Sequence, residues 1–474
     1  MKRFPAFLLA LVLLSLCLCL SACAEDTLVS GDFRYALLED GTAVILQYTG
    51  EEEILSVPGE LGGAAVSAIG PKAFEWCTSL IDVTLPGSLA EIGDYAFLYC
   101  KNLAFVNLPD SVKTIGKNPF AACESLSDLE LSPGHAVLAL EGGVLYSRPD
   151  ARLVAYSMTL PKGPFTVPED VEIIGASAFY NCETLTELSL PDTISSIGQK
   201  AFFGCVNLKS VNLPDSISYI GAEAFNGCRG LRSLVFPDTV TSIGDSAFED
   251  CVNLEEIKLP EGAFTIGDRA FCNCSSLRSV TLPEEITVIG KNTFAECRNL
   301  VEITLPEEVT YIGGGAFLDC YALEEIEIPE GVSYIGSNAF YFCQSLREIQ
   351  LPETCFYIGA NAFYGCSSLT EFELPAVISA INLGVFQGCT GLTELEIPPR
   401  VTSIGNLAFA GCSGLTEMDI PDSVTSIGEK AFYYCIGLES VSLPDSLSYV
   451  APDAFDHCPN LEDLPDLSGL SEPE

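Results

Sequence analysis

A cysteine recurs every 23 residues through more than half of the chain. Each of these cysteines stands three residues after a phenylalanine, which an alanine usually precedes, as Ala178-Phe179 precedes Cys182. A strict repeat of this length predicts a stack of similar coils, in which each coil contacts only its neighbours. The register comprises Cys182, Cys205, Cys228, Cys251, Cys274, Cys297, Cys320, Cys343, Cys366, Cys389, Cys412, Cys435 and Cys458.

The cysteines of this register are expected to lie inside the stack as free thiols. Cys77, Cys100 and Cys123 repeat the spacing earlier in the chain, beside apolar neighbours, as small buried hydrophobic residues would. Strands that stack about 4.8 Å apart bring neighbouring cysteines within disulfide range, but parallel side chains in a packed core are poorly oriented for bridging. The spacing leaves open whether any pair is disulfide-bonded. No CxxC motif of the zinc-binding kind occurs, so we expect no metal site.

The coil at residues 323–343 illustrates the expected fold. Ile326 and Ile328 alternate with glutamates, which predicts a strand with its aliphatic side inward, and Pro329 ends that strand because it cannot donate a ladder hydrogen bond. A second short extended segment follows, and residues 337–343 fit one or two helical turns. The predicted fold is a leucine-rich repeat solenoid of 23-residue coils, with a parallel β-sheet along one face and short helical turns on the other.

This coil resembles the BspA-like leucine-rich repeat, whose pattern is LxxIxLPxxVxxIGxxAFxxC. Residues 300–306 and 309–320 carry the pattern, and the resemblance covers residues 54–131 and 167–464. It implies a bacterial surface protein that adheres to host matrix proteins or to other cells. The departures from the pattern are Phe236, Cys355 and the stretch 382–386.

The N-terminal residues have the pattern of an export signal. Two basic residues precede the apolar run 4–20, which is short for a transmembrane helix. The run ends in Leu20-Ser21-Ala22-Cys23, which resembles the bacterial lipobox. We therefore expect residues 1–22 to be a lipoprotein signal peptide and Cys23 to carry the lipid. The mature protein would then lie outside the cytoplasm, at the cell surface, with this lipid as its only membrane anchor. An ordinary signal peptide cut nearby implies the same side of the membrane.

Breaks in the 23-residue pattern divide the rest of the chain. Two apolar stretches flank Asp40-Gly41, which is a strong hairpin signal, and this hairpin is expected to cap the open end of the first coil. A second strand–turn–strand pattern surrounds Arg148-Pro149-Asp150, as either a recognition loop or a tolerated insertion. The expected segments are an N-terminal β-hairpin cap at 23–53, a first repeat block at 54–131, a hairpin insertion at 132–166, a second repeat block at 167–464 and a disordered tail at 465–474.

The formal charge of the chain is −43, from 65 acidic and 22 basic residues. Such a surface repels phosphate and anionic headgroups, which disfavours nucleic-acid binding and permits a basic protein partner. Acids gather in two outward columns of the main strand, which Arg232, Arg278 and Arg347 are expected to offset slightly. These columns are either a candidate binding face or a solvated face produced by duplication of coils. They contain Glu302, Glu325, Glu327, Glu348, Glu371, Glu373, Glu394, Glu396, Glu417 and Asp419.

A third outward column is aromatic. Tyr311, Tyr334 and Tyr357 each stand directly before an Ile-Gly pair, one coil apart. Stacked tyrosines suit either a contact surface for sugar or protein or a ladder that stabilises the sheet. We expect no cofactor, apart from weak calcium binding by the acidic columns.

The sequence offers little support for catalysis. It has no Gly-x-Ser-x-Gly elbow, no HExxH motif and no phosphate-binding loop, and its two histidines, His135 and His457, lie far apart in the array. The favoured function is a non-enzymatic, surface-anchored recognition or adhesion protein that binds host or cell-surface proteins through its solenoid face. The alternative is a structural or scaffolding lipoprotein of the bacterial envelope.

Overall fold

The computed structural model describes residues 27–261 and 265–462. Of these described residues, those up to Pro161 together with Glu172–Thr184 form one compact unit, and Lys162–Val171 with those from Leu185 on form another. The expected signal peptide 1–22, the lipid site Cys23 and the tail 465–474 lie outside the described residues. In the part of the chain that is described, no helix is long and apolar enough to cross a membrane.

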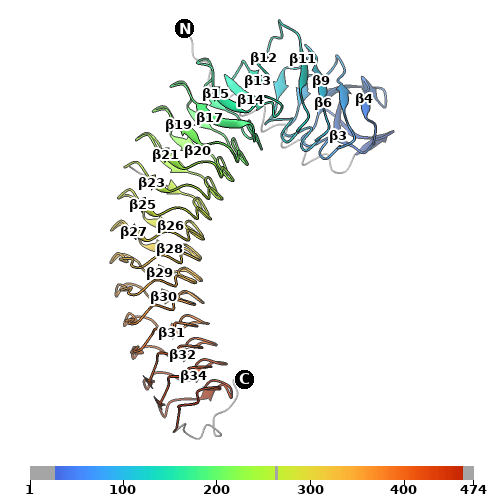
Figure 1. The fold of residues 1–474 in the computed structure, drawn as a ribbon. Coiled ribbons are helices and arrows are strands. Elements are labelled where there is room, and N and C mark those ends of the chain that lie inside the picture. The colour runs from blue at the N-terminus through green and yellow to red at the C-terminus, as the bar shows by residue number, and fades with distance from the viewer. Residues whose placement is uncertain (1–26, 262–264, 463–474) are drawn as a thin grey trace. The chain divides into compact units, whose positions relative to one another are not determined.

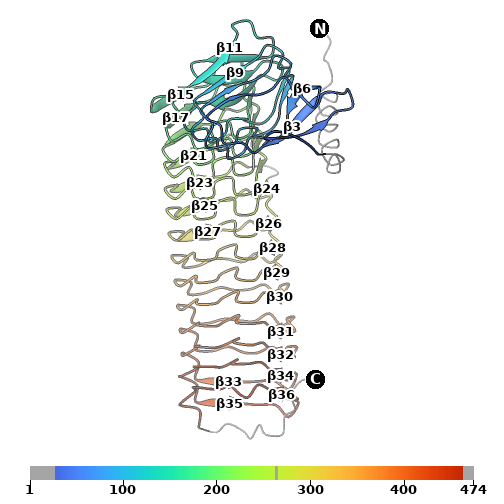
Figure 2. The ribbon, with the colours of Figure 1, turned by 90° about the vertical axis from the view of Figure 1, so that its right-hand side faces the viewer.

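In the second unit, successive coils contribute strands to two sets of parallel sheets (Figure 1). The main strands pair at the 23-residue register, as Ser279 does with Glu302, and the short strands pair as Tyr311 does with Tyr334. In Figure 2 the main strands run down one side of the stack and the short strands down the other. The expected sheet is therefore accompanied by a second one.

The main strands of this unit are β15 (Gly163–Thr166), β17 (Leu185–Ser189), β19 (Ser210–Asn212), β21 (Ser233–Val235), β23 (Glu256–Lys258), β25 (Ser279–Thr281), β27 (Glu302–Thr304), β33 (Glu417–Asp419) and β35 (Ser440–Ser442). The short strands are β18 (Ser196–Ile197), β20 (Tyr219–Ile220), β22 (Ser242–Ile243), β24 (Thr265–Ile266), β26 (Val288–Ile289), β28 (Tyr311–Ile312), β29 (Tyr334–Ile335), β30 (Tyr357–Ile358), β31 (Ala380–Ile381), β32 (Ser403–Ile404), β34 (Ser426–Ile427) and β36 (Tyr449–Val450).

The expected helical turns are wrong, because the described residues contain no helix. In the coil at residues 323–343, Asn338 and Phe342 have φ of 59° and 56°, whereas an α-helix needs negative φ throughout. Turns replace the helix: the amide of Cys343 donates to the Phe340 carbonyl at 3.2 Å, and that of Phe342 donates to Tyr364 in the next coil at 2.7 Å. The frequent Gly, Asn or Asp just before the cysteine, as at Gly365, was the sequence signal for this left-handed backbone.

The core of the second unit is built from two ladders. Phenylalanine rings from Phe202 to Phe455 stack with centroids 5.0 to 5.9 Å apart. Beside them, each thiol of the 23-residue register from Cys228 to Cys458 donates to the phenylalanine carbonyl of the preceding coil, at 3.0 to 3.3 Å. The described cysteines are free thiols, as expected from the register. Cysteine therefore combines a small apolar volume with a donor for a buried carbonyl.

The first unit contains both stretches that break the repeat pattern, and both fold as three-stranded antiparallel meanders. One is β1-β2-β3 and the other is β12-β13-β14, and the last strand of each pairs in parallel with a short strand, β6 or β16. Tyr48 and Tyr156 end these meanders and pack against Phe74 and Phe179, with ring centroids 5.4 and 5.0 Å apart. In its strand order, the segment around Arg148 is thus a second copy of the N-terminal cap.

The strands of this unit are β1 (Leu28–Ser30), β2 (Phe33–Leu37), β3 (Ala43–Tyr48), β4 (Ile54–Ser56), β5 (Glu60–Leu61), β6 (Ala64–Ile69), β7 (Asp82–Thr84), β8 (Glu91–Ile92), β9 (Phe105–Leu108), β10 (Thr114–Ile115), β11 (Asp128–Leu131), β12 (Leu138–Glu141), β13 (Val144–Ser147), β14 (Arg152–Tyr156) and β16 (Ile173–Ile174).

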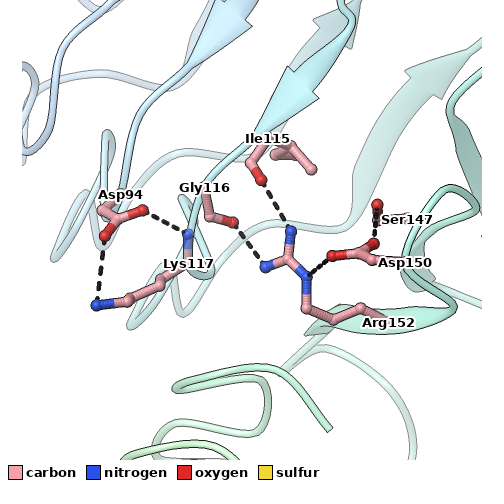
Figure 3. A network of polar contacts seen from close by, with 7 residues as sticks. All are labelled: Asp94, Ile115, Gly116, Lys117, Ser147, Asp150 and Arg152. Atoms are coloured by element: carbon pink, nitrogen blue, oxygen red, sulfur yellow. Dashed lines mark hydrogen bonds and ion pairs between the residues drawn. The ribbon is translucent and has the colours of Figure 1, made fainter. Parts of the chain in front are cut away.

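Arg152 of the second meander closes the last short strand of the first repeat block, β10 (Figure 3). Its guanidinium donates to the carbonyls of Ile115 at 2.9 Å and Gly116 at 3.2 Å. A further coil would otherwise engage the Ile115 carbonyl, as the Gly116 amide engages Ile92 at 2.8 Å. The Asp150 carboxylate lies 2.9 Å from Nε of Arg152, and the Ser147 hydroxyl donates to the same carboxylate. A mostly buried cation thus satisfies carbonyls that the interrupted repeat leaves open.

We predict that thiol accessibility follows position in the ladder. Burial raises the pKa of Cys389 to about 12, whereas a hydrogen bond from Cys435 lowers the pKa of the half-buried Cys458. At pH 8, iodoacetamide should therefore label Cys77 and Cys458 in the native protein and the other described cysteines only after unfolding. Peptide mapping by mass spectrometry checks this, with a reduced sample as control. Rapid labelling of Cys320 in the native state would contradict the buried ladder.

Arg152→Met should lower the free energy of unfolding by about 2 kcal/mol, because it leaves two carbonyls without their charged donor. Lys117→Met is the matched control, since Lys117 pairs with Asp94 at 3.5 Å at an exposed site (Figure 3), and its loss should cost less than about 1 kcal/mol. Urea unfolding measures both variants. Equal effects would show that Arg152 is not the closing residue of β10.

Candidate binding faces

The ten predicted acids are all exposed in the main-strand column of the second unit, and we call them the acidic face. Glu302 lies on β27 and Glu417 and Asp419 lie on β33, whereas the other seven lie in the coils between these two strands. Alternation along the strand explains their direction, because Ile303 and Ile326 beside them are only 5% and 4% exposed. Glu325 pairs with Glu348 and Glu371 with Glu394 in parallel bridges, which places like charges directly opposite each other. These bridges align Glu325 with Glu348 and Glu371 with Glu394 across neighbouring coils.

The acidic face has no internal counter-charge. Among residues 27–261 and 265–462, none of its ten carboxylates forms an ion pair. Two of the arginines expected to offset it have partners elsewhere: Arg232 lies 3.8 Å from Glu255 and Arg347 lies 3.5 Å from Glu324. Gln350 alone donates to a member, at 3.2 Å to Glu348. Like charges opposite each other destabilise a sheet, so this face carries uncompensated repulsion.

The tyrosine stripe belongs to the other set of sheets, on β28, β29 and β30. The rings of Tyr311 and Tyr334 stack 4.8 Å apart, and those of Tyr334 and Tyr357 stack 4.7 Å apart, each at 8°. Burial, followed by the two neighbouring hydroxyls, raises the pKa of Tyr334. Because the rings cover each other's faces, the geometry favours a stabilising ladder over a sugar platform, which needs free ring faces.

Neither histidine lies in a catalytic arrangement. His135 is buried, and its Nδ1 accepts from the amides of Val137 at 3.2 Å and Leu138 at 3.1 Å, so it orders the chain before the second meander. His457 packs against the rings of Tyr433 and Tyr434. No three His, Cys, Asp or Glu side chains are arranged to hold a metal ion anywhere in the described ranges.

The first unit also contains a cavity that no sequence pattern led us to expect. Its volume is about 160 Å³, and it lies beside β11. Six of the lining residues are Phe120, Ser127, Leu129, Leu140, Ala155 and Met158. A sequence signal existed, because β11 is the last main strand before the repeat pattern fails at residue 132 and no further coil follows it directly.

Comparison with known proteins agrees with this architecture. Solved structures similar to the chain include a leucine-rich repeat protein from Bacteroides ovatus, with 26% identity over 90% of this chain and 99% of that one and a TM-score of 0.54. A leucine-rich cell surface protein from Faecalibacterium prausnitzii has 26% identity over 88% and 96%, with a TM-score of 0.41. Among curated proteins there is no significant match.

A family model for the BspA type leucine rich repeat region matches residues 64–139, 155–278, 264–393 and 356–471. These matches cover most of the chain and both repeat blocks. Such a family is consistent with protein binding or adhesion in general and with association with the cell surface. The chain belongs to the BspA-type leucine-rich repeat family.

Proposed function

We propose that this protein is a non-enzymatic surface recognition protein whose acidic face binds a cationic protein surface. The observation that carries the proposal is the absence of ion pairs at the ten exposed carboxylates, within the residues that are described. A column of like charges is costly to the isolated sheet, and a basic partner would relieve that cost on binding. Host matrix or cell-surface proteins with basic patches are the partners of this chemistry.

Surface attachment completes this proposal. Lipidation of Cys23, expected from the lipobox-like sequence, would tether the chain outside the cytoplasm, where such partners are found. The repeat family supports surface association in general terms. Globomycin treatment tests the anchor, since a lipoprotein precursor should then keep its signal peptide and the Cys23→Ala variant should not be lipidated.

Binding to immobilised matrix proteins should weaken when the acidic face is neutralised. The quadruple variant Glu325→Gln, Glu348→Gln, Glu371→Gln and Glu394→Gln removes four pairs worth about 0.5 kcal/mol each, which is about a 30-fold loss of affinity at low salt. The loss should shrink as salt screens the charges. Surface plasmon resonance with the mature chain measures both effects.

The matched control neutralises four exposed turn acids with the same change in net charge: Asp170→Asn, Asp192→Asn, Asp215→Asn and Asp238→Asn. It should retain most of the affinity. Equal losses in the two variants would show that net charge, and not the acidic face, drives binding. No binding to any matrix protein at any salt concentration would refute the proposed partner class.

The acidic face is also where weak calcium binding is expected. Calcium should raise the melting temperature by about 2 °C over a chelator-treated sample, because a cation shared by opposite pairs such as Glu325 and Glu348 relieves their repulsion. The quadruple glutamine variant should lose this response, and sodium at matched ionic strength controls for screening. An unchanged melting temperature with and without chelator would exclude the cation.

A further inference from the structure

The main-strand sheet of the first unit ends in an open edge at β11. This sheet has the order β11-β9-β7-β4 (Figure 1). The amide of Asp128 donates to Ala104 at 3.1 Å, toward β9. Backbone groups alternate along a strand, so Leu129 and Leu131 direct theirs away from β9. Within the described part of the chain, no hydrogen bond engages these groups.

One other sheet end in this unit, at β10, is closed by a side chain, and it provides a comparison for β11. Arg152 covers the carbonyls at the end of β10 (Figure 3). At β4, the opposite end of the same sheet, the inward Leu55 is only 4% exposed. On β11 the inward Leu129 and Leu131 stay half-exposed. At β11, half-exposed inward leucines therefore occur together with backbone groups that have no hydrogen-bond partner among the described residues.

The cavity of about 160 Å³ lies directly beside this edge. Leu129, Leu140 and Met158 supply apolar walls, and Ser127 and Asp128 place the start of β11 in its lining. An apolar cavity of about 150 Å³ accommodates a molecule of the size of benzene. The space beside β11 therefore fits one Val, Leu or Phe side chain and leaves no room for a large ligand.

The outward residues of β11 define the charge of the occupant. Asp128 and Glu130 are both exposed, and neither forms an ion pair among the residues described. A strand that paired with β11 would place every second side chain beside these carboxylates. A partner strand that alternates basic and apolar residues would therefore match β11: its basic side chains would lie beside the outward acids, and its apolar side chains beside the inward leucines.

We propose that β11 binds an extended peptide in which apolar and basic residues alternate, by adding it as a parallel strand with one apolar side chain in the cavity. The backbone of Leu129 and Leu131 provides the hydrogen bonds, the cavity selects the apolar anchor, and Asp128 and Glu130 select the basic residues. This site lies in the first unit and is separate from the acidic face of the second.

The test uses the full mature chain and a fluorescent, capped nonapeptide that alternates lysine with valine and carries one central phenylalanine. Fluorescence anisotropy measures its affinity. Asp128→Lys combined with Glu130→Lys should weaken binding about tenfold or more, from two lost charge pairs. Ala155→Leu, which fills the cavity, should weaken the phenylalanine peptide more than a peptide with alanine at that position.

Two further comparisons separate strand addition from simple charge attraction. N-methylation of one alternating set of peptide amides should abolish binding, and methylation of the other set should leave it, because only one set faces β11. Glu51→Lys with Glu53→Lys, near β4 at the other end of the sheet, should change affinity little. The proposal fails if a peptide with the same residues in blocks binds equally well, if both methylated peptides bind alike, or if no peptide binds.

The quadruple glutamine variant of the acidic face distinguishes this proposal from the proposed function. It should bind the nonapeptide as the unmodified chain does while losing affinity for matrix proteins. If it loses both, peptide binding occurs at the acidic face and the β11 site is refuted.

Discussion

Hydrogen bonds between successive coils hold this protein together. A single coil cannot bury its apolar face, so its main strand, its short strand and the turns before each cysteine all bond to the next coil. The thiol ladder adds a side-chain bond to the same set, as Cys320 does to Phe294 at 3.2 Å. Every position is therefore determined by its neighbours 23 residues away, and outward positions are free to vary.

The same dependence makes the ends of a block the chemically special places. Where a repeat stops, carbonyls, amides and aliphatic side chains that the next coil would cover become available. The second meander closes one such end with Arg152 and begins the next ladder with Tyr156 on Phe179. At β11 no equivalent closure exists among the described contacts, and an open edge, a cavity and two acids coincide there. Function can thus arise from an interruption of the repeat as well as from its surface.

The two candidate faces differ in how they use their side chains. The tyrosines satisfy one another by stacking, so that Tyr334 between its neighbours is already half-buried. The carboxylates of the acidic face repel one another and have no cationic partner within the described residues. Stacking stabilises the sheet, so the tyrosine stripe is explained without a ligand. Repulsion within the acidic face costs stability, and the acidic face is therefore the stronger candidate for a binding surface.

Periodicity by itself determined the solenoid, the inward place of Cys320 and Phe340, and the outward direction of Glu325, because a 23-residue repeat repeats its environment. Periodicity wrongly predicted helical turns. Ala339 and Cys343 are four residues apart, which fits a helix, but this spacing does not reveal that Phe342 between them has positive φ. Only the tertiary structure showed that the segment around Arg148 pairs with β16 and that β11 has an open edge. Those features depend on hydrogen bonds between segments that are far apart in the sequence, and a local sequence pattern does not predict such bonds.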